Sequence, residues 1–212
     1  MGEWVIMEMK EVFNTIYAKG TWRNSEECPR AGMGSTKNYC KAIFPILVDL
    51  GCNNRDNWLP EELTRSDRYF GIDIVPDVSP HLVGDLTEIG EWFPKIPSSP
   101  RFFFIKDVLH HWPTSSVMSW LQEMRERMSP DDLLLTINGR GQMNSRSQAW
   151  ATGERIYKAH YGPLQLGKPP FNDDFGFSVE RVMETWKPKT KEALAWQVPA
   201  TSTRGGYNGS KE

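Results

Sequence analysis

The chain has 212 residues, with 25 lysines and arginines against 27 aspartates and glutamates, so its formal net charge is -2. At about 150 residues per domain, this length predicts one domain with extensions, large enough to bury a core without disulfides or a bound metal. The near balance of charge argues against a globally basic surface for binding nucleic acid. No apolar run reaches the ~20 residues that a membrane-spanning helix needs.

The cysteines and the N-terminus point to a reducing compartment. Cys28, Cys40 and Cys52 are an odd set with no CxxC motif or Cys/His ligand pattern around them. The N-terminal segment is acidic and lacks the basic-then-apolar order of a secretion signal. We therefore expect a cytoplasmic protein with no structural disulfide and no metal site.

Apolar runs and helical spacing predict elements that alternate along the chain. The expected strands, in chain order, are residues 46–50, 68–74, 82–85, 101–105, 132–137 and 193–198. The expected helices are residues 3–18, 36–44, 58–64, 115–128, 147–160 and 178–186. This alternation predicts an α/β fold around a mostly parallel central sheet.

Polar residues follow the ends of the expected strands, where parallel α/β sheets bind their ligands. Asp49 and Gly51 end the first strand, Asp73 ends the second 24 residues after Asp49, and Asp85 follows the third. The fourth strand leads into the segment KDVLHHW, residues 106–112. A dinucleotide-binding GxGxxG turn and a phosphate-binding GK[ST] loop are both missing from these positions.

Taken in order, these segments resemble the class I S-adenosylmethionine-dependent methyltransferases. The turn VDLGC is similar to that family's glycine-containing loop, Asp73 in YFGIDI to its ribose-binding carboxylate, and Asp85 in GDL to the side chain near the adenine amine. The resemblance implies a Rossmann-like class I methyltransferase fold and S-adenosyl-L-methionine as the cofactor. The cofactor-binding residues that it implies are Asp49, Gly51, Asn53, Asp73, Ile74, Asp85, Leu86, Lys106, Asp107, Tyr17 and Trp22.

A narrower resemblance covers roughly residues 12–177 and joins the chain to small bacterial and phage methyltransferase-like proteins. It rests on FNTIYAKGTW, GMGST, VDLGCNNRDNW, YFGIDI, KDVLHHW and the late PLQLGKPPF. The layout that it implies is a helical lid at 1–35, a methyltransferase-like domain at 36–200 with substrate-side loops at 139–180, and a disordered tail at 201–212.

His110 and His111 are the candidate catalytic residues, together with Asp107. An imidazole beside the methyl donor acts as a general base when the acceptor is a hydroxyl, and Asp107 orients a histidine or contacts the cofactor. We favour His111 because Trp112 and Pro113 then begin the next helix. The equally weighted alternative for each is a structural histidine or a solvated loop aspartate.

The methyl acceptor is not encoded in these motifs, and three hypotheses remain. We expect a small molecule or a glycan, since the net charge is near zero; Asn138 and Arg140 follow the fifth strand and are placed to reach it. A catalytically inactive binding or assembly domain is the second, because Asn53 and Arg55 stand where relatives have glycine. A nucleic-acid methyltransferase is the third, suggested by basic and aromatic residues in the C-terminal loops.

Overall fold

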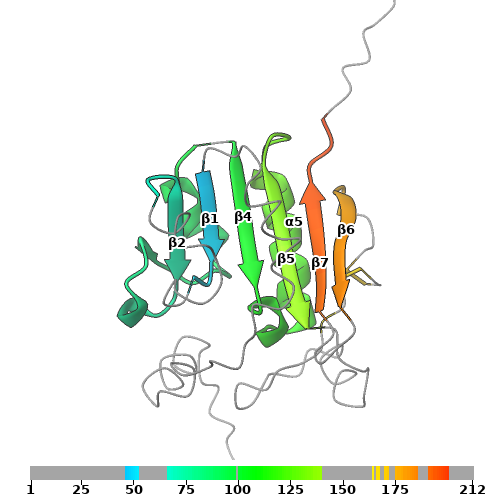
Figure 1. The fold of residues 1–212 in the computed structure, drawn as a ribbon, viewed down its shortest axis with the longest axis horizontal. Coiled ribbons are helices and arrows are strands. Elements are labelled where there is room, and N and C mark those ends of the chain that lie inside the picture. The colour runs from blue at the N-terminus through cyan, green and yellow to red at the C-terminus, as the bar shows by residue number, and fades with distance from the viewer. Residues whose placement is uncertain are drawn as a thin grey trace, which may run out of the picture.

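The computed structural model describes residues 46–52, 66–98, 100–139, 164, 166–167, 170–171, 175–185 and 191–200. A seven-stranded sheet runs through them in the order β3-β2-β1-β4-β5-β7-β6 (Figure 1). The strands are β1 Ile46–Leu50, β2 Tyr69–Asp73, β3 Leu82–Val83, β4 Arg101–Lys106, β5 Leu133–Gly139, β6 Ser178–Thr185 and β7 Lys191–Gln197.

Most of the sheet is parallel. β1 pairs in parallel with β2 and β4, β2 with β3, and β4 with β5, whereas β7 runs antiparallel to both β5 and β6. The expected α/β class with a mostly parallel sheet is confirmed. The ends of β1, β2, β4 and β5 therefore meet at one edge of the sheet, here called the carboxyl edge.

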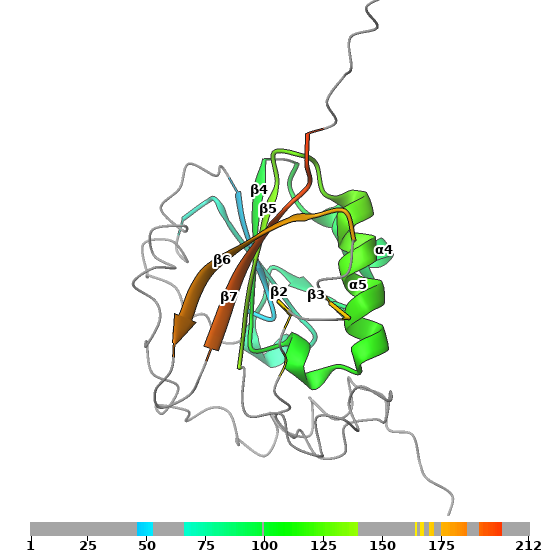
Figure 2. The ribbon, with the colours of Figure 1, turned by 90° about the vertical axis from the view of Figure 1, so that its right-hand side faces the viewer.

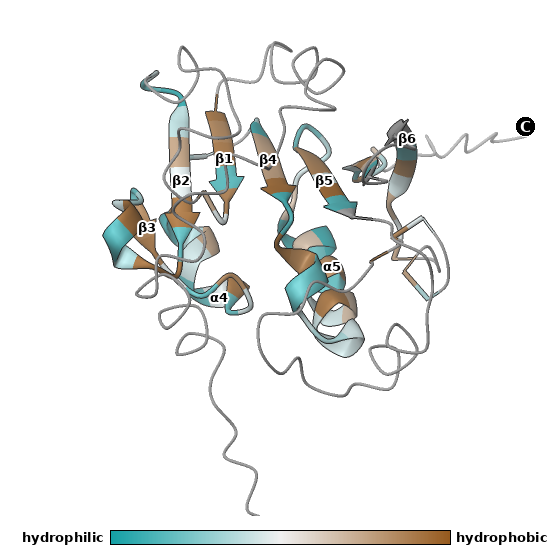
Figure 3. Cartoon of the chain, turned by 60° about the horizontal axis from the view of Figure 1, so that its bottom comes forward, coloured by the Kyte–Doolittle hydropathy of each residue, from teal (hydrophilic) through white to brown (hydrophobic). Residues whose placement is uncertain are grey.

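Both faces of the sheet are buried, which explains the continuous apolar runs of β1 and β4. Val48, Leu50, Phe103 and Ile105 belong to the core cluster that includes the helices. The alternate residues, among them Phe102, face a second cluster on the other side of the sheet. The strands are mainly apolar in colour, and β1 and β5 turn hydrophilic at their arrowheads (Figure 3). In β1 and β5, hydrophilic residues thus lie close to the carboxyl edge.

Helices α4 (Ile89–Trp92) and α5 (Thr114–Arg127) lie on the same face of the sheet (Figure 2). Val117, Trp120, Leu121 and Met124 of α5 are buried, a spacing that puts one apolar stripe against the sheet. Short 3₁₀ helices complete the path: η1 Pro76–Val78, η2 Phe93–Lys95 and η3 Leu109–His111. In the described ranges, no helix has the length and apolar character required to cross a membrane.

One expected element is wrong: residues 178–186 are not a helix. Ser178–Thr185 forms β6, which pairs with β7 along its length and has a register shift between Arg181 and Met183. β-Branched residues favour a strand when a neighbour supplies a hydrogen-bonding edge, and β7 supplies that edge. The helices expected at 3–18, 36–44, 58–64 and 147–160 lie outside the described residues, as does the tail at 201–212.

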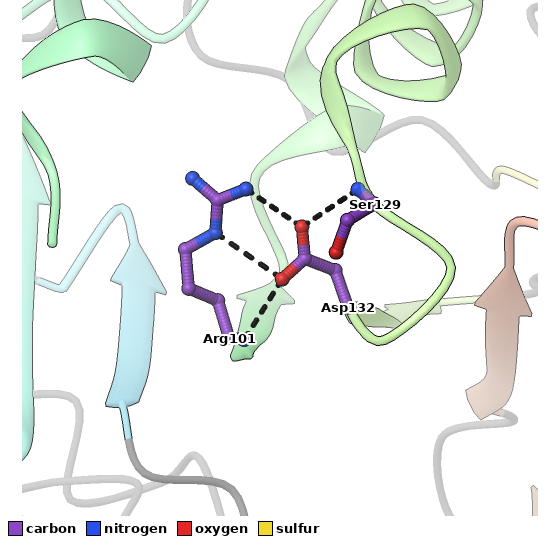
Figure 4. Close-up of polar contacts among 3 residues, drawn as sticks. All are labelled: Arg101, Ser129 and Asp132. Atoms are coloured by element: carbon purple, nitrogen blue, oxygen red, sulfur yellow. Dashed lines mark hydrogen bonds and ion pairs between the residues drawn. The ribbon is translucent and has the colours of Figure 1, made fainter. Parts of the chain in front are cut away.

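A buried ion pair between Arg101 and Asp132 connects the N-terminal ends of β4 and β5, at the edge opposite the carboxyl edge. Arg101 donates from Nε to Asp132 Oδ1 at 3.2 Å and from Nη2 to Oδ2 at 2.7 Å (Figure 4). The backbone N–H groups of Arg101 and Ser129 also donate to this carboxylate. Phe93 and Phe103 lie against the guanidinium, with ring centroids at 4.5 and 5.2 Å. Asp132 therefore has a hydrogen-bond donor for each oxygen despite its full burial.

Candidate functional site

Gly51 forms the turn at the end of β1. Its φ of +77° lies in the left-handed region, which glycine adopts without steric cost. Its N–H and that of Cys52 both donate to the carbonyl of Ile72, at 2.8 and 3.1 Å, so the turn curls against the end of β2. A Cβ on Gly51 would lie 2.5 Å from Cγ2 of Val108. The chain itself therefore requires glycine here, independently of any ligand.

Asp49 lies below this turn and is held by Tyr69, a residue that the sequence motifs did not single out. The Tyr69 hydroxyl donates to Oδ2 of Asp49 at 2.8 Å, and both side chains are buried. The bond connects β1 to the beginning of β2. It orients the Asp49 carboxylate within the sheet, and the expected contact of Asp49 with a cofactor stays a prediction.

Asp73 ends β2 next to the Gly51 turn, and its side chain is 5% exposed. Its Oδ1 accepts a hydrogen bond from the Val75 N–H at 3.0 Å, which fixes the carboxylate at the strand end. Ile74, the next residue, is half-buried.

The expected adenine side of the site lies after β3. Asp85 Oδ1 accepts from the N–H of Thr87 at 2.8 Å and from its hydroxyl at 2.7 Å, so the carboxylate closes the turn before α4. Leu86 is buried, and its carbonyl accepts the indole N–H groups of Trp92 and Trp120 at 3.2 and 2.9 Å. Two tryptophans thus fix the position of the backbone beside Asp85.

Lys106 and Asp107 follow at the end of β4. Their side chains form an ion pair at 3.0 Å. Asp107 has a φ of +57°, a conformation that aspartate tolerates better than most residues. Its N–H donates to the Ile137 carbonyl at 2.8 Å, so the chain leaves β4 along the end of β5. The left-handed backbone turns the segment from the strand into η3.

His110 and His111 both lie in η3 and are buried, at 1% and 6% exposure. Nδ1 of His110 is 3.8 Å from Oδ1 of Asp107, and the two imidazole centroids are 4.2 Å apart. Burial lowers the pKa of His111 to about 4, although the charge of Asp107 and a hydrogen bond to its backbone act in the opposite direction. His111 is therefore a neutral imidazole at physiological pH.

Farther along the carboxyl edge, Asn138 of β5 lies opposite Glu192 of β7 in the antiparallel ladder. Both side chains are buried, each at 3% exposure. Oε2 of Glu192 accepts the Gly167 N–H at 3.2 Å, which connects β7 to the PLQLGKPPF segment. The sequence reasoning missed Glu192. Its signal is weak, since Glu192 follows Lys191 and only precedes the apolar run ALAW.

The expected site residues therefore separate into two groups. Within the described part of the chain, Asp49, Gly51, Asp73 and Ile74 lie at the ends of the adjacent strands β1 and β2. Lys106 and Asp107 lie at the end of β4 with His110 and His111 in η3 beyond them, and Asp85 and Leu86 follow β3. Tyr17, Trp22, Asn53, Arg55 and Arg140 lie outside the described residues, so their expected roles stay predictions.

Comparison with known proteins gives a match only at the level of the fold. No protein-family model matches the chain, and no curated protein matches it in sequence. Among solved structures, a SAM-dependent methyltransferase from Archaeoglobus fulgidus superposes with a TM-score of 0.57 at 14% identity, covering 86% of this chain and 99% of that one. The complex of DhpI with SAH gives 0.57 at 12% identity, covering 90% and 96%.

Human N-acetylserotonin methyltransferase, solved in complex with SAM, superposes with a TM-score of 0.51 at 12% identity. The match covers 92% of this chain and 61% of the human one. These structures share the strand arrangement at identities too low to transfer an activity. The chain accordingly has the class I methyltransferase fold, a Rossmann-like mostly parallel sheet with an antiparallel β7.

Proposed function

We propose that the protein is a methyltransferase that binds S-adenosyl-L-methionine over the ends of β1, β2 and β4. The observation that carries this proposal is the buried Asp73 carboxylate at the end of β2, beside the left-handed Gly51 turn of β1. In a parallel sheet these two positions lie side by side, so one ligand can meet a backbone turn and a carboxylate together.

The residues present fit the cofactor's parts. Asp73 accepts hydrogen bonds from the ribose hydroxyls, and the Gly51 turn offers backbone close to the methionine part. Ile74 and Leu86 provide apolar contacts near the base. Asp85 lies beside them with one carboxylate oxygen already accepting from Thr87. Lys106 and Asp107 border the methionine part from the end of β4.

The bound cofactor would supply an electrophilic methyl group on a sulfonium sulfur, whose S–C bond breaks as the acceptor's lone pair forms the new bond. The protein's part is to align the acceptor with that methyl group and to exclude water. A hydroxyl acceptor must also lose its proton. His111, neutral at physiological pH, and the neighbouring His110 and Asp107 are the groups that take or orient it.

The acceptor class that we propose is a small molecule or a glycan. The net charge of -2 supports it, because a protein that holds nucleic acid through phosphates needs a basic surface. Asp49 and Asp73 are buried at this edge, and the cation of Lys106 is paired with Asp107. Two buried carboxylates, and a lysine already paired with an aspartate, do not favour a polyphosphate ligand.

Calorimetric titration with S-adenosylmethionine and S-adenosylhomocysteine tests the proposal. We expect both to bind, and Asp73→Ala to weaken them by about tenfold to a hundredfold, the effect of losing hydrogen bonds to a charged group. Asp77→Ala is the matched control, since Asp77 is an exposed carboxylate in η1. Absence of binding at millimolar ligand, or an affinity unchanged in Asp73→Ala, would refute the assignment.

A further inference from the structure

The amide of Asn138 is an unexplained polar group at the carboxyl edge. Its side chain is 3% exposed, and its Oδ1 has no hydrogen-bond partner in the described part of the chain. A buried acceptor without a donor destabilises the fold, because it has lost its hydration and gained no hydrogen bond in return. Such a group therefore points to a donor that arrives from outside the chain.

Glu192 faces the same side of the sheet as Asn138. Thr136 and Asn138 alternate with Ile137 along β5, and Thr136 accepts the indole N–H of Trp196 on that side at 2.9 Å. Glu192 and Trp196 likewise share one face of β7. Because Asn138 and Glu192 are direct partners in the ladder, their Cβ atoms lie about 5 Å apart. The amide oxygen and the carboxylate thus form one acceptor-rich patch.

This patch lies beyond the residues that we assign to the cofactor. β5 and β7 follow β4 in the sheet, on the side away from Asp73. The patch is close to the expected methyl-transfer region. The η3 helix, which holds His110 and His111, packs against β5, and the Asp107 N–H donates to the carbonyl of Ile137 in β5. A ligand that reaches from His110 and His111 along the end of β5 would meet Asn138 next.

We propose that Asn138 and Glu192 form the far end of the acceptor pocket and receive an O–H or N–H group of the methyl acceptor. The inference rests on the proposed function and deepens it. It makes the acceptor a neutral or cationic alcohol or amine, and it excludes one that presents a carboxylate or phosphate at this position.

The charges support this choice of ligand. An amide oxygen and an ionised carboxylate both accept hydrogen bonds. An anionic ligand group placed beside Glu192 would meet a like charge, whereas an ammonium group would gain a charge-assisted hydrogen bond.

Three probes that share a phenyl ring test the head-group preference: benzyl alcohol, benzylamine and benzoate. Each is titrated into the protein with and without saturating S-adenosylhomocysteine, and binding is followed by the side-chain amide resonance of Asn138. We expect the alcohol and the amine to bind at least tenfold more tightly than benzoate, and to shift this resonance.

Variants separate the two acceptor groups. Asn138→Leu removes the amide oxygen and should weaken both favoured probes about fivefold, whereas Asn138→Asp retains an oxygen and should keep them. Glu192→Gln should weaken benzylamine about tenfold and benzyl alcohol less. Gln197→Leu removes an exposed amide at the other end of β7 and should change nothing. If Asn138→Leu does not fold, the aspartate and glutamine variants still decide the question.

Equal or tighter binding of benzoate overturns the inference, as does wild-type affinity in Asn138→Leu or Glu192→Gln, or no binding of any probe up to its solubility limit. Titration with S-adenosylhomocysteine in the same samples distinguishes a failure of this inference from a failure of the proposed cofactor site. Binding of S-adenosylhomocysteine without probe preference refutes only the acceptor pocket. Probe preference without nucleoside binding refutes only the cofactor assignment.

Discussion

Gly51 and Asp107 end adjacent strands with a left-handed backbone, and they do so for different reasons. At Gly51 the absent side chain matters twice, because φ is +77° and Val108 fills the space where a Cβ would lie. At Asp107 a short polar side chain tolerates φ of +57° and pairs with Lys106. Both conformations direct the chain out of the sheet at the carboxyl edge.

Gly51→Ala should lower the free energy of unfolding by about 1–3 kcal/mol, the cost of a strained backbone conformation, with added repulsion from Val108. The double variant with Val108→Ala removes Cγ2, the atom that meets the new Cβ at 2.5 Å. We expect its loss of stability to be smaller than the sum of the single losses, measured by urea unfolding. Strict additivity would contradict the contact.

His111 should make the stability of the fold depend on pH. Its pKa is about 4 in the folded chain and 6.5 ordinarily, so between these values the unfolded state binds the proton and the folded state does not. Stability therefore rises with pH across this window, by about 3 kcal/mol in all. Urea unfolding from pH 4 to 7 should show this slope, and His111→Gln should reduce it. An equally steep slope in the variant would contradict the assignment to His111.

At the scale of elements, the buried strands were predictable and the edge hairpin was not. VDL and RFFFI in β1 and β4 are continuous apolar runs because both faces of the sheet are covered. β6 is an edge strand, and its Val179 is 42% exposed. Its sequence therefore lacks the clear alternation of buried and exposed residues that predicts a strand. The spacing of its valines fits a helix nearly as well. The pairing with β7 makes this segment a strand, and the residues of β6 alone do not reveal that pairing.

Asp132→Asn should cost about 3 kcal/mol of unfolding free energy at pH 7, because Arg101 would stay buried without its counter-charge. Burial raises the pKa of Asp132, but hydrogen bonds and the charge of Arg101 outweigh it and hold the pKa below its ordinary value. The stabilisation is therefore present above pH 4 or so and is lost as pH falls through the folded-state pKa.

Chemical unfolding of this variant and the wild type from pH 7 down to about pH 3 should show the gap between them narrowing. Glu123→Gln breaks the half-exposed pair with Arg127 in α5 and serves as the control. It should cost less than ~0.5 kcal/mol. A gap that stays constant with pH would show that the charge of Asp132 is not what stabilises the start of β4 and β5.

At the scale of the whole molecule, the sheet order brings to one edge the residues of the two proposed sites, which are far apart in the chain. Asp73 and Asp107 come from strands on either side of β1, and Glu192 is more than eighty residues farther along. Strand-end rules predicted Asp49, Asp73 and Asp107 because each follows its own apolar run. They could not predict Glu192 or Tyr69, since these matter through partners on other strands, Asn138 and Asp49.

If the proposed cofactor site is real, S-adenosylhomocysteine should stabilise the entire fold. A ligand at a hundred times its dissociation constant adds about 2.7 kcal/mol, which for a chain of this length raises the midpoint of thermal unfolding by roughly 5–10 °C. Differential scanning fluorimetry measures the shift, and Asp73→Ala at the same ligand concentration should reduce it by about half or more. A shift of equal size in the variant would place the ligand elsewhere.

The rate at which the Cys52 thiol reacts with a labelling reagent should measure how often this edge of the sheet opens. It is fully buried after the Gly51 turn, and a Cβ on Gly71 would lie 2.9 Å from its sulfur. A thiol reagent reaches it only when β1 and β2 separate at their ends. With Cys28 and Cys40 changed to serine, the rate of labelling reports how often the turn opens in the native protein. Any ligand that closes over Gly51 and Asp73 should slow that rate in proportion to its occupancy.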